Sequence, residues 1–127
     1  MRSLTGRFLS TCLVFGMLFG CKAENLVELL PDRLTLEAFS LRGEMISQQA
    51  LDSSDIHYQR LKGLLEMRRD GWVANVTSYR TSPYVFRGGA LIVRCYADLI
   101  VIDVTRSGHS ASYKKKIPGL FAILGLS

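Results

Sequence analysis

The chain contains few of the residues that crosslink small exported domains or bind metal ions. Its 127 residues include only three cysteines and two histidines. Cys12 and Cys21 belong to an amino-terminal apolar stretch, which leaves Cys95 as the one cysteine further along the chain. His57 and His109 lie far apart, and neither has an acidic residue at metal-ligand spacing. We therefore expect no disulfide framework, no metal site and no cofactor, and the fold must rest on its hydrophobic core.

The sequence also lacks an apolar run long enough to span a membrane. The longest stretch without charge is residues 8–21, in which the apolar run at 8–20 precedes Cys21. A spanning helix needs about 20 apolar residues to cross ~30 Å of hydrocarbon. Arg2 and Arg7 precede the run, and no acidic residue lies before it. A positive flank, a short apolar core and a small residue before a break are typical of a secretory signal.

Residues 18–21, Leu-Phe-Gly-Cys, resemble the lipobox of bacterial lipoproteins, in which a leucine, two small residues and a cysteine end the signal. Leu18, Gly20 and Cys21 match this pattern, whereas Phe19 stands where a small residue is usual. The resemblance implies that the Cys21 thiol carries a diacylglyceryl group and that Cys21 becomes the first residue of the mature protein.

Lys22 follows the candidate lipidation site. By analogy with enterobacterial sorting, a residue other than aspartate at this position implies the outer membrane, with the domain facing the periplasm. Several acyl chains on one cysteine would anchor a small domain without any membrane-spanning segment. An ordinary signal peptide cleaved after residues 21–23 is the alternative interpretation.

Length and composition predict one small domain after this signal. We expect residues 1–20 to form the lipoprotein signal, residues 21–33 a lipid-anchored tether, and residues 34–127 a single domain. The chain is 48% apolar and 21% charged, which is an ordinary balance for a globular protein.

Acidic residues are scarce in the second half of the chain. The formal net charge is +5, and residues 71–127 contain only Asp98 and Asp103 as acids. In an exported protein, such charge favours anionic lipid headgroups, polysaccharide or an acidic protein face over nucleic acid. The candidate residues for an anionic partner are Arg80, Arg87, Arg94, Lys114, Lys115 and Lys116.

Hydrophobic periodicity predicts two strands followed by one helix. Residues 34–41 alternate apolar and polar side chains, residues 42–43 read as a turn, and residues 44–50 read as a weaker strand. Ser54 and Asp55 can cap a helix at about residues 54–69, which Gly71 would end.

The remainder of the chain is rich in residues that favour strands. We expect strands at residues 72–80, 84–86, 91–96 and 99–104, with a tight hairpin joining the last two at the sheet's centre. Residues 111–117 read as an edge strand whose lysines discourage further pairing. The predicted fold class is α+β, with one main helix packed on an antiparallel sheet of about four to five strands.

This layout resembles a class of small bacterial envelope lipoproteins that place one helix before a β-meander. The similarity covers about residues 34–117 and includes residues 79–84, Tyr-Arg-Thr-Ser-Pro-Tyr, and the hairpin at 91–104. Because no activity is assigned to that class, the resemblance implies a fold and a location but no catalytic residues.

Three local patterns touch on chemistry, and each has a simpler interpretation. Residues 108–112, Gly-His-Ser-Ala-Ser, lack the last glycine of a nucleophile elbow, and no acid or histidine follows Ser110. Residues 75–77, Asn-Val-Thr, match an N-glycosylation acceptor, which is relevant only in a eukaryotic secretory pathway. Cys95 lies within a strong strand and is expected to be a small core residue.

These observations favour a non-enzymatic, membrane-anchored lipoprotein that binds an envelope protein or an anionic surface. The alternatives are a periplasmic small-ligand-binding protein or hydrolase that uses Arg80, Arg87 and Arg94, or an inhibitor or immunity-type lipoprotein. The apolar tail, residues 120–126, is expected to pack on the sheet, although its position after three lysines also suits a membrane interface.

Overall fold

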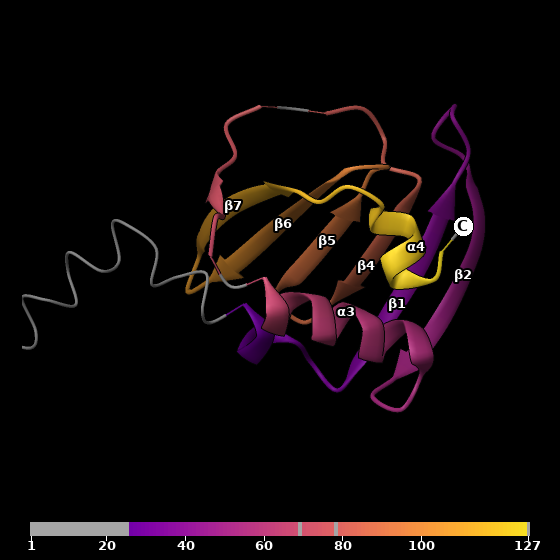
Figure 1. Ribbon diagram of the computed structural model, residues 1–127, viewed down its shortest axis with the longest axis horizontal. Helices are drawn as coiled ribbons and strands as arrows, with labels where there is room; N and C mark the ends of the chain where they lie inside the picture. The colour runs from indigo at the N-terminus through magenta and orange to yellow at the C-terminus, as the bar shows by residue number, and fades with distance from the viewer. Residues whose placement is uncertain (1–25, 69, 78, 127) are drawn as a thin grey trace, which may run out of the picture.

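The computed structural model describes residues 26–68, 70–77 and 79–126, which form one antiparallel sheet with helices on one face (Figure 1). Seven strands lie in the order β2-β1-β4-β5-β6-β7-β3. The strands are β1 (Arg33–Phe39), β2 (Met45–Asp52), β3 (Val73–Ala74), β4 (Tyr84–Gly88), β5 (Leu91–Cys95), β6 (Leu99–Arg106) and β7 (His109–Lys116). The 3-10 turn η1 (Val27–Leu29) precedes them, and the α-helices are α3 (Ile56–Met67) and α4 (Leu120–Leu124). The α+β class is confirmed, with more strands than expected.

The two additional strands arise at the edges of the sheet. β2 pairs along its whole length with β1, although its sequence is only weakly strand-like. β3 pairs with β7 through two residues, so β7 is covered and is not the edge strand that we expected. Pairing with a neighbour therefore sets the strand number, because short or polar segments extend a sheet once a strong strand presents free backbone groups.

The hairpin of β5 and β6 occupies the middle of the sheet, as the sequence predicted. Tyr96 donates its backbone N–H to Leu99, which closes the tight turn. Leu91, Val93 and Cys95 are at most 1% exposed and face the helices. Ile92 and Arg94 point the other way, because side chains alternate along a strand.

Asp55 caps the start of α3 as predicted, whereas the helix ends at Met67, two residues before the predicted end at residue 69. Asp55 accepts a hydrogen bond from the backbone N–H of His57 at 2.9 Å, which satisfies a free donor of the first turn. Gly71 adopts a positive φ of 82° in the turn that follows the helix. Tyr58, Leu61, Leu64 and Leu65 are buried against the sheet.

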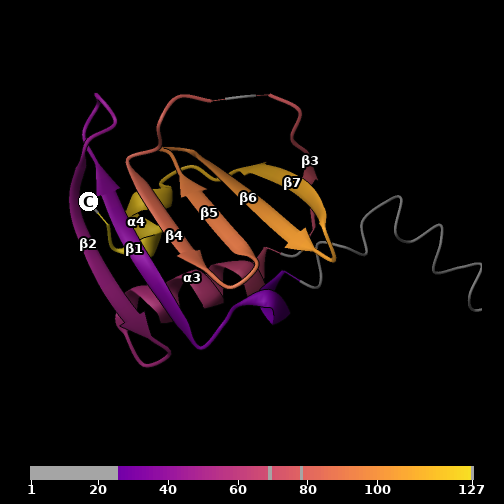
Figure 2. The same cartoon turned by 180° about the vertical axis from the view of Figure 1, so that it is seen from behind.

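The carboxyl-terminal tail packs on the fold, as we expected. Within residues 120–126, Leu120, Leu124 and Leu126 are buried in the core, and the Phe121 ring meets that of Tyr84 edge-on at 5.1 Å between centroids. α4 contacts α3, so both helices cover the same face of the sheet (Figure 2). Each fully buried Leu or Phe side chain contributes roughly 1.5–3 kcal/mol to the free energy of unfolding.

The folded domain begins earlier than the tether boundary that we placed at residue 33. Leu26 is only 2% exposed and belongs to the core, and Val27, Leu29 and Leu30 pack against it. Tyr58 donates its hydroxyl to the Pro31 carbonyl at 2.6 Å. An apolar segment of this density packs on the sheet because burial outweighs the entropy of a free tether. Cys21, the candidate lipidation site, lies outside the described residues.

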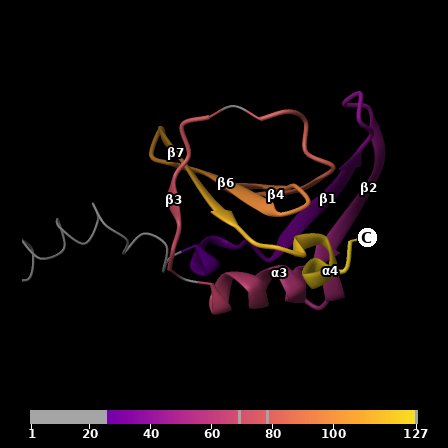
Figure 3. The ribbon, with the colours of Figure 1, turned by 45° about the horizontal axis from the view of Figure 1, so that its top comes forward.

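One expected strand is largely absent. Of the described residues 72–77, 79 and 80, only Val73 and Ala74 are in a strand. The chain then crosses from the β3 edge to β4 near the middle of the sheet, above the face that carries no helix (Figure 3). A segment that runs across strands cannot join their hydrogen-bond ladder, so β-favouring side chains such as Val76, which is 91% exposed, do not form a strand here. We call residues 75–83 the crossing segment.

Candidate functional site: a polar network on the helix-free face

Strand register sets which side chains share the face opposite the helices, which we call the helix-free face. Residues directly opposite each other in an antiparallel ladder point to the same side. Two rows of side chains therefore lie on this face, running across β1, β4, β5, β6 and β7 in turn. The first row is Thr35, Arg87, Ile92, Asp103 and Ser112, and the second is Glu37, Val85, Arg94, Val101 and Lys114.

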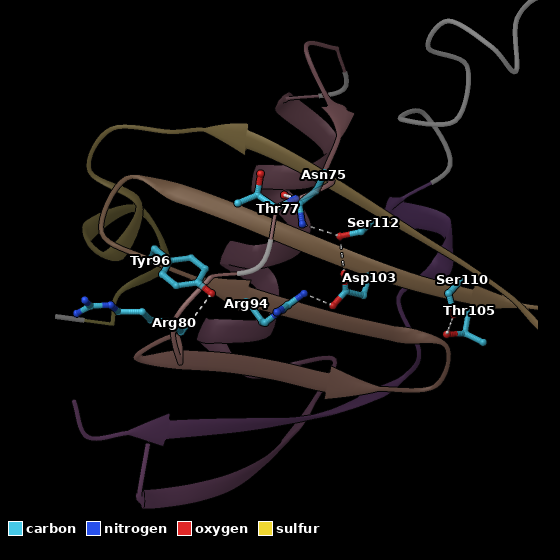
Figure 4. A network of polar contacts seen from close by, with 9 residues as sticks. All are labelled: Asn75, Thr77, Arg80, Arg94, Tyr96, Asp103, Thr105, Ser110 and Ser112. Carbon is cyan, nitrogen blue, oxygen red and sulfur yellow. Dashed lines mark hydrogen bonds and ion pairs between the residues drawn. The ribbon is translucent and has the colours of Figure 1, made fainter. Parts of the chain in front are cut away.

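Asp103 stands at the centre of a hydrogen-bonded network on this face (Figure 4). Its Oδ2 accepts from Nη2 of Arg94 at 2.5 Å, and its Oδ1 accepts from the hydroxyl of Ser112 at 2.6 Å. Ser112 in turn accepts from the side-chain amide of Asn75 at 3.2 Å. The Asn75 backbone N–H also donates to the Ser112 carbonyl at 2.8 Å. The network thus links β5, β6 and β7 to the start of the crossing segment.

Two tyrosines and a lysine attach the middle of the crossing segment. Tyr96 donates its hydroxyl to the Arg80 carbonyl at 2.8 Å, and its ring lies 5.6 Å from that of Tyr79. The Lys114 ammonium donates to the Tyr79 hydroxyl at 3.3 Å and lies 5.9 Å from the ring centroid, within the range of a cation–π contact.

A small second apolar layer lies on the helix-free face. Val85 and Val101 are 4% and 0% exposed, yet they are not part of the core under the helices. The register places them on either side of Arg94. Both valines are thus shielded from solvent on this face. The Arg94–Asp103 pair lies beside them, with its side chains about one third exposed.

Two buried side-chain atoms lack a hydrogen-bond partner within the part of the chain that the structure describes: Nε of Arg94 and Oγ of Ser82. Burial also raises the pKa of Tyr96, and the positive charge of Arg94 opposes that rise. The carboxylate of Asp103 accepts from Arg94 and Ser112 at once, so its charge is compensated locally.

The basic residues that we expected to bind an anionic partner do not converge. Arg87 contacts the buried carboxylate of Glu37 at 3.3 Å, and Arg94 contacts Asp103. Arg80 is exposed on the crossing segment. Two of the three arginines are thus paired with carboxylates of the fold, although the Arg87 side chain is still 49% exposed.

The three lysines of β7 also separate, because successive strand residues face opposite sides. Lys114 lies on the helix-free face beside Tyr79. Lys115 lies on the helix side, where its ammonium donates to the Asp70 carbonyl at 2.7 Å. Lys116 is exposed at the end of the strand. Alternation places Lys116 on the same face as Lys114, so only Lys115 is separated from the other two.

The remaining sequence patterns have structural roles. Ser110 lies in β7 and not at a strand-to-helix turn, and its hydroxyl is 3.4 Å from that of Thr105. Nδ1 of His57 lies 3.2 Å from the Leu124 carbonyl, so this ring joins α3 to α4. Burial raises the pKa of Cys95, whose side chain is fully enclosed, which disfavours a reactive thiolate.

No cluster of three or more His, Cys, Asp or Glu side chains with metal-binding geometry occurs among the described residues. None of the helices within the described part of residues 26–126 combines the length and apolarity that a bilayer-crossing segment needs.

Sequence reasoning missed Asp103, Ser112 and Asn75 as members of one network. Part of the signal was present, because a two-residue turn at 97–98 places Arg94 opposite Val101, and therefore diagonal to Asp103. The partners on β7 and on the crossing segment depend on tertiary placement, for which the sequence holds no local pattern.

No protein-family model matches the chain, and no curated protein or solved structure is significantly similar to it.

Proposed function

We propose that this chain is a lipid-anchored protein of the bacterial envelope whose α+β domain binds another envelope component and catalyses no reaction. The observation that carries the proposal is the sequence of residues 18–21, Leu-Phe-Gly-Cys, directly after the uncharged run at residues 8–20. The proposed anchor is Cys21, and the proposed location is the outer membrane, facing the periplasm.

The start of the folded domain supports a short anchor. Only four residues, 22–25, separate Cys21 from the buried Leu26. At about 3.6 Å per residue, a fully extended connection would reach roughly 18 Å. The domain of a lipidated chain would therefore stay close to the headgroups, on the side where η1 lies beside the carboxyl end of α3 (Figure 1).

The use of polar side chains supports binding over catalysis. On the helix-free face the charged groups contact one another, as Arg87 does with Glu37 and Arg94 with Asp103. In the predicted basic set, Lys114 donates to a tyrosine hydroxyl and Lys115 to a backbone carbonyl, whereas the side chains of Arg80 and Lys116 have neither an ion-pair nor a hydrogen-bond partner among the described residues. These two cations are the part of the predicted basic set that would contact an anionic envelope partner, with no nucleic acid and no cofactor involved.

Metabolic labelling with a palmitate analogue tests the anchor, and the chain supplies a matched control. Cys21→Ala should abolish the label and release the protein from membranes, whereas Cys12→Ala, in the apolar run, should leave both unchanged. A labelled Cys21→Ala chain or an unlabelled natural chain would contradict the proposal. Lys22→Asp should shift the labelled chain to the inner membrane if enterobacterial sorting applies.

A pull-down from solubilised membranes tests the partner. The natural chain should recover an envelope component whose yield falls when Arg80 and Lys116 are both changed to glutamine. Arg106→Gln, which changes an exposed arginine at the end of β6, serves as the control for loss of charge alone.

A further inference from the structure

The edge strands on the two sides of the sheet differ in length and in nearby charge. At one edge, β3 is only two residues long, and β7 beside it ends in three lysines. Short edge strands and lysines are common devices that prevent a sheet from pairing with another chain. At the other edge, β2 runs for eight residues.

The β2 edge is neither short nor rich in lysine, and its one irregularity is a β-bulge at its start, where Phe39 pairs with Met45 and Ala38 with Ser47. Residues 45–51, Met-Ile-Ser-Gln-Gln-Ala-Leu, contain no charge and no proline. Every residue of β2 except Leu51 is exposed, with Met45 at 50% and Ile46 at 67%. Such an edge presents unpaired backbone N–H and carbonyl groups along its full length, which favours pairing with a further strand.

We propose that β2 pairs antiparallel with β2 of a second copy of this chain, about a two-fold axis at Gln48. The two sheets would join into one continuous sheet with all helices on the same side. That arrangement requires paired residues to point to the same face, so their numbers must sum to an even value.

The register centred on Gln48 matches like with like. It pairs Ser47 with Gln49 and Gln48 with its own copy, and it brings the exposed Ile46, at the β-bulge, beside Ala50, while Leu51 stays buried in the core of its own copy. A shift of two residues, centred on Gln49, would instead oppose Ile46 to Asp52 and Ser47 to Leu51. Apolar contacts opposite apolar ones stabilise a strand pair, and mixed pairs do not. The self-complementary pattern therefore selects a second copy as the occupant of this edge.

Exposed apolar side chains at both ends of β2 support the same partner. Leu41, in the turn before β2, is fully exposed, and Ile56, the first residue of α3, is 58% exposed. In the register centred on Gln48, the turn of one copy lies beside the start of α3 of the other. Leu41 of one copy would then lie near Ile56 of its partner, at both ends of the two-fold interface.

Two double variants that differ only in the sign of the charge at position 49 test the pairing and its register. In both, Ser47→Lys is introduced, and it is combined with Gln49→Lys in the first and Gln49→Glu in the second. Because Ser47 of one copy faces Gln49 of the other, the first variant opposes lysine to lysine twice. The second opposes lysine to glutamate twice, while each monomer keeps the same backbone and the same exposed positions.

The experiment co-expresses the full chain with two different tags and measures recovery of one tag with the other after detergent extraction. The natural chain and the lysine–glutamate variant should copurify, and the lysine–lysine variant should lose copurification. Passive sharing of micelles would be equal in all three, so it cannot produce this difference. Repeating the series in Cys21→Ala should give the same order, which separates pairing from the lipid anchor.

Three results would overturn the proposal. The natural chain could fail to copurify, or the lysine–lysine variant could copurify as well as the natural chain. The third is loss of copurification in both double variants while circular dichroism shows both folded, because this would exclude the register centred on Gln48.

Discussion

The two faces of the sheet are built from the same strands but are held in different ways. On one face, α3, α4 and η1 bury a continuous apolar core that includes Phe86, Val93 and Ile102, each at 0% exposure. On the other, a single crossing segment lies over a network of hydrogen bonds centred on Asp103, with Val85 and Val101 as a small apolar layer. Figure 3 shows the helices below the sheet and the crossing segment above it.

The two faces therefore have different roles: one supplies most of the stability, and the other fixes the position of the crossing segment. The free energy gained by apolar burial is roughly proportional to the area removed from water. The larger apolar core under the helices therefore supplies most of the folding free energy. Hydrogen bonds contribute little net energy each, but an unmade one is costly. The network therefore fixes where the crossing segment lies more than it stabilises the whole chain.

The largest effect is expected on the helix side. Phe86→Ala removes a fully buried ring from the middle of the sheet and should lower the free energy of unfolding by about 3–5 kcal/mol. Chemical denaturation followed by circular dichroism would measure it. Val85→Ala, the next residue on the opposite face, is the matched control and should cost clearly less. Equal losses would mean that the two faces carry equal shares of stability.

An intermediate effect is expected in the network. Asp103→Ala leaves Arg94 and Ser112 without their shared acceptor and should cost about 1–2 kcal/mol, since its side chain is partly exposed. Arg94→Met alone should cost a similar amount.

The double variant of Arg94 and Asp103 should cost less than the sum of the two single changes, because one removal already breaks the contact. Strict additivity in the same denaturation assay would show that the pair makes no net contribution. Asp103→Asn, which keeps the shape and one acceptor oxygen, should fall between the natural chain and Asp103→Ala.

Sequence reasoning succeeded where local pattern and final structure agree. Cys95 was correctly predicted as a core residue from its place in a strongly apolar strand. Asp55 identified the start of α3, because a cap acts within a few residues. The packing of the tail was also predictable, since so many apolar side chains need cover.

The crossing segment shows why the rest was not predictable. Residues 75–80 favour strands by composition, and the route of the described residues 75–77, 79 and 80 across the sheet excludes these from the ladder. The network joins Asn75, Arg94, Asp103 and Ser112 from four parts of the chain, so its members meet only after the sheet has formed. Likewise, the basic set failed to converge because strand alternation separates Lys115 from its neighbours.

A smaller effect is expected from two tyrosines that act as a matched pair across the faces. Tyr58, on the helix side, donates to the Pro31 carbonyl, and Tyr96, on the helix-free face, donates to that of Arg80. Either change to phenylalanine should cost about 0.5–1.5 kcal/mol. Hydrogen exchange should then distinguish them, because Tyr96→Phe should loosen the crossing segment alone. Increased exchange throughout the sheet in Tyr96→Phe would contradict a local role.

The smallest effect is expected at alkaline pH, where the same two tyrosines differ in their charged neighbours. Burial raises the pKa of both, but Asp32 adds to the rise at Tyr58 whereas Arg94 opposes it at Tyr96. A tyrosine whose pKa is raised by folding contributes stability that is complete below its unfolded pKa of about 10. That contribution is lost as the pH increases through the folded pKa, because the unfolded chain releases its proton first. The natural chain should therefore lose stability above about pH 10. Tyr58→Phe should reduce that loss more than Tyr96→Phe, in urea titrations at successive pH values. The reverse order would mean that burial raises the pKa of Tyr96 more than that of Tyr58 in spite of the nearby charge of Arg94. The helix-free face would then be the more strongly desolvated of the two.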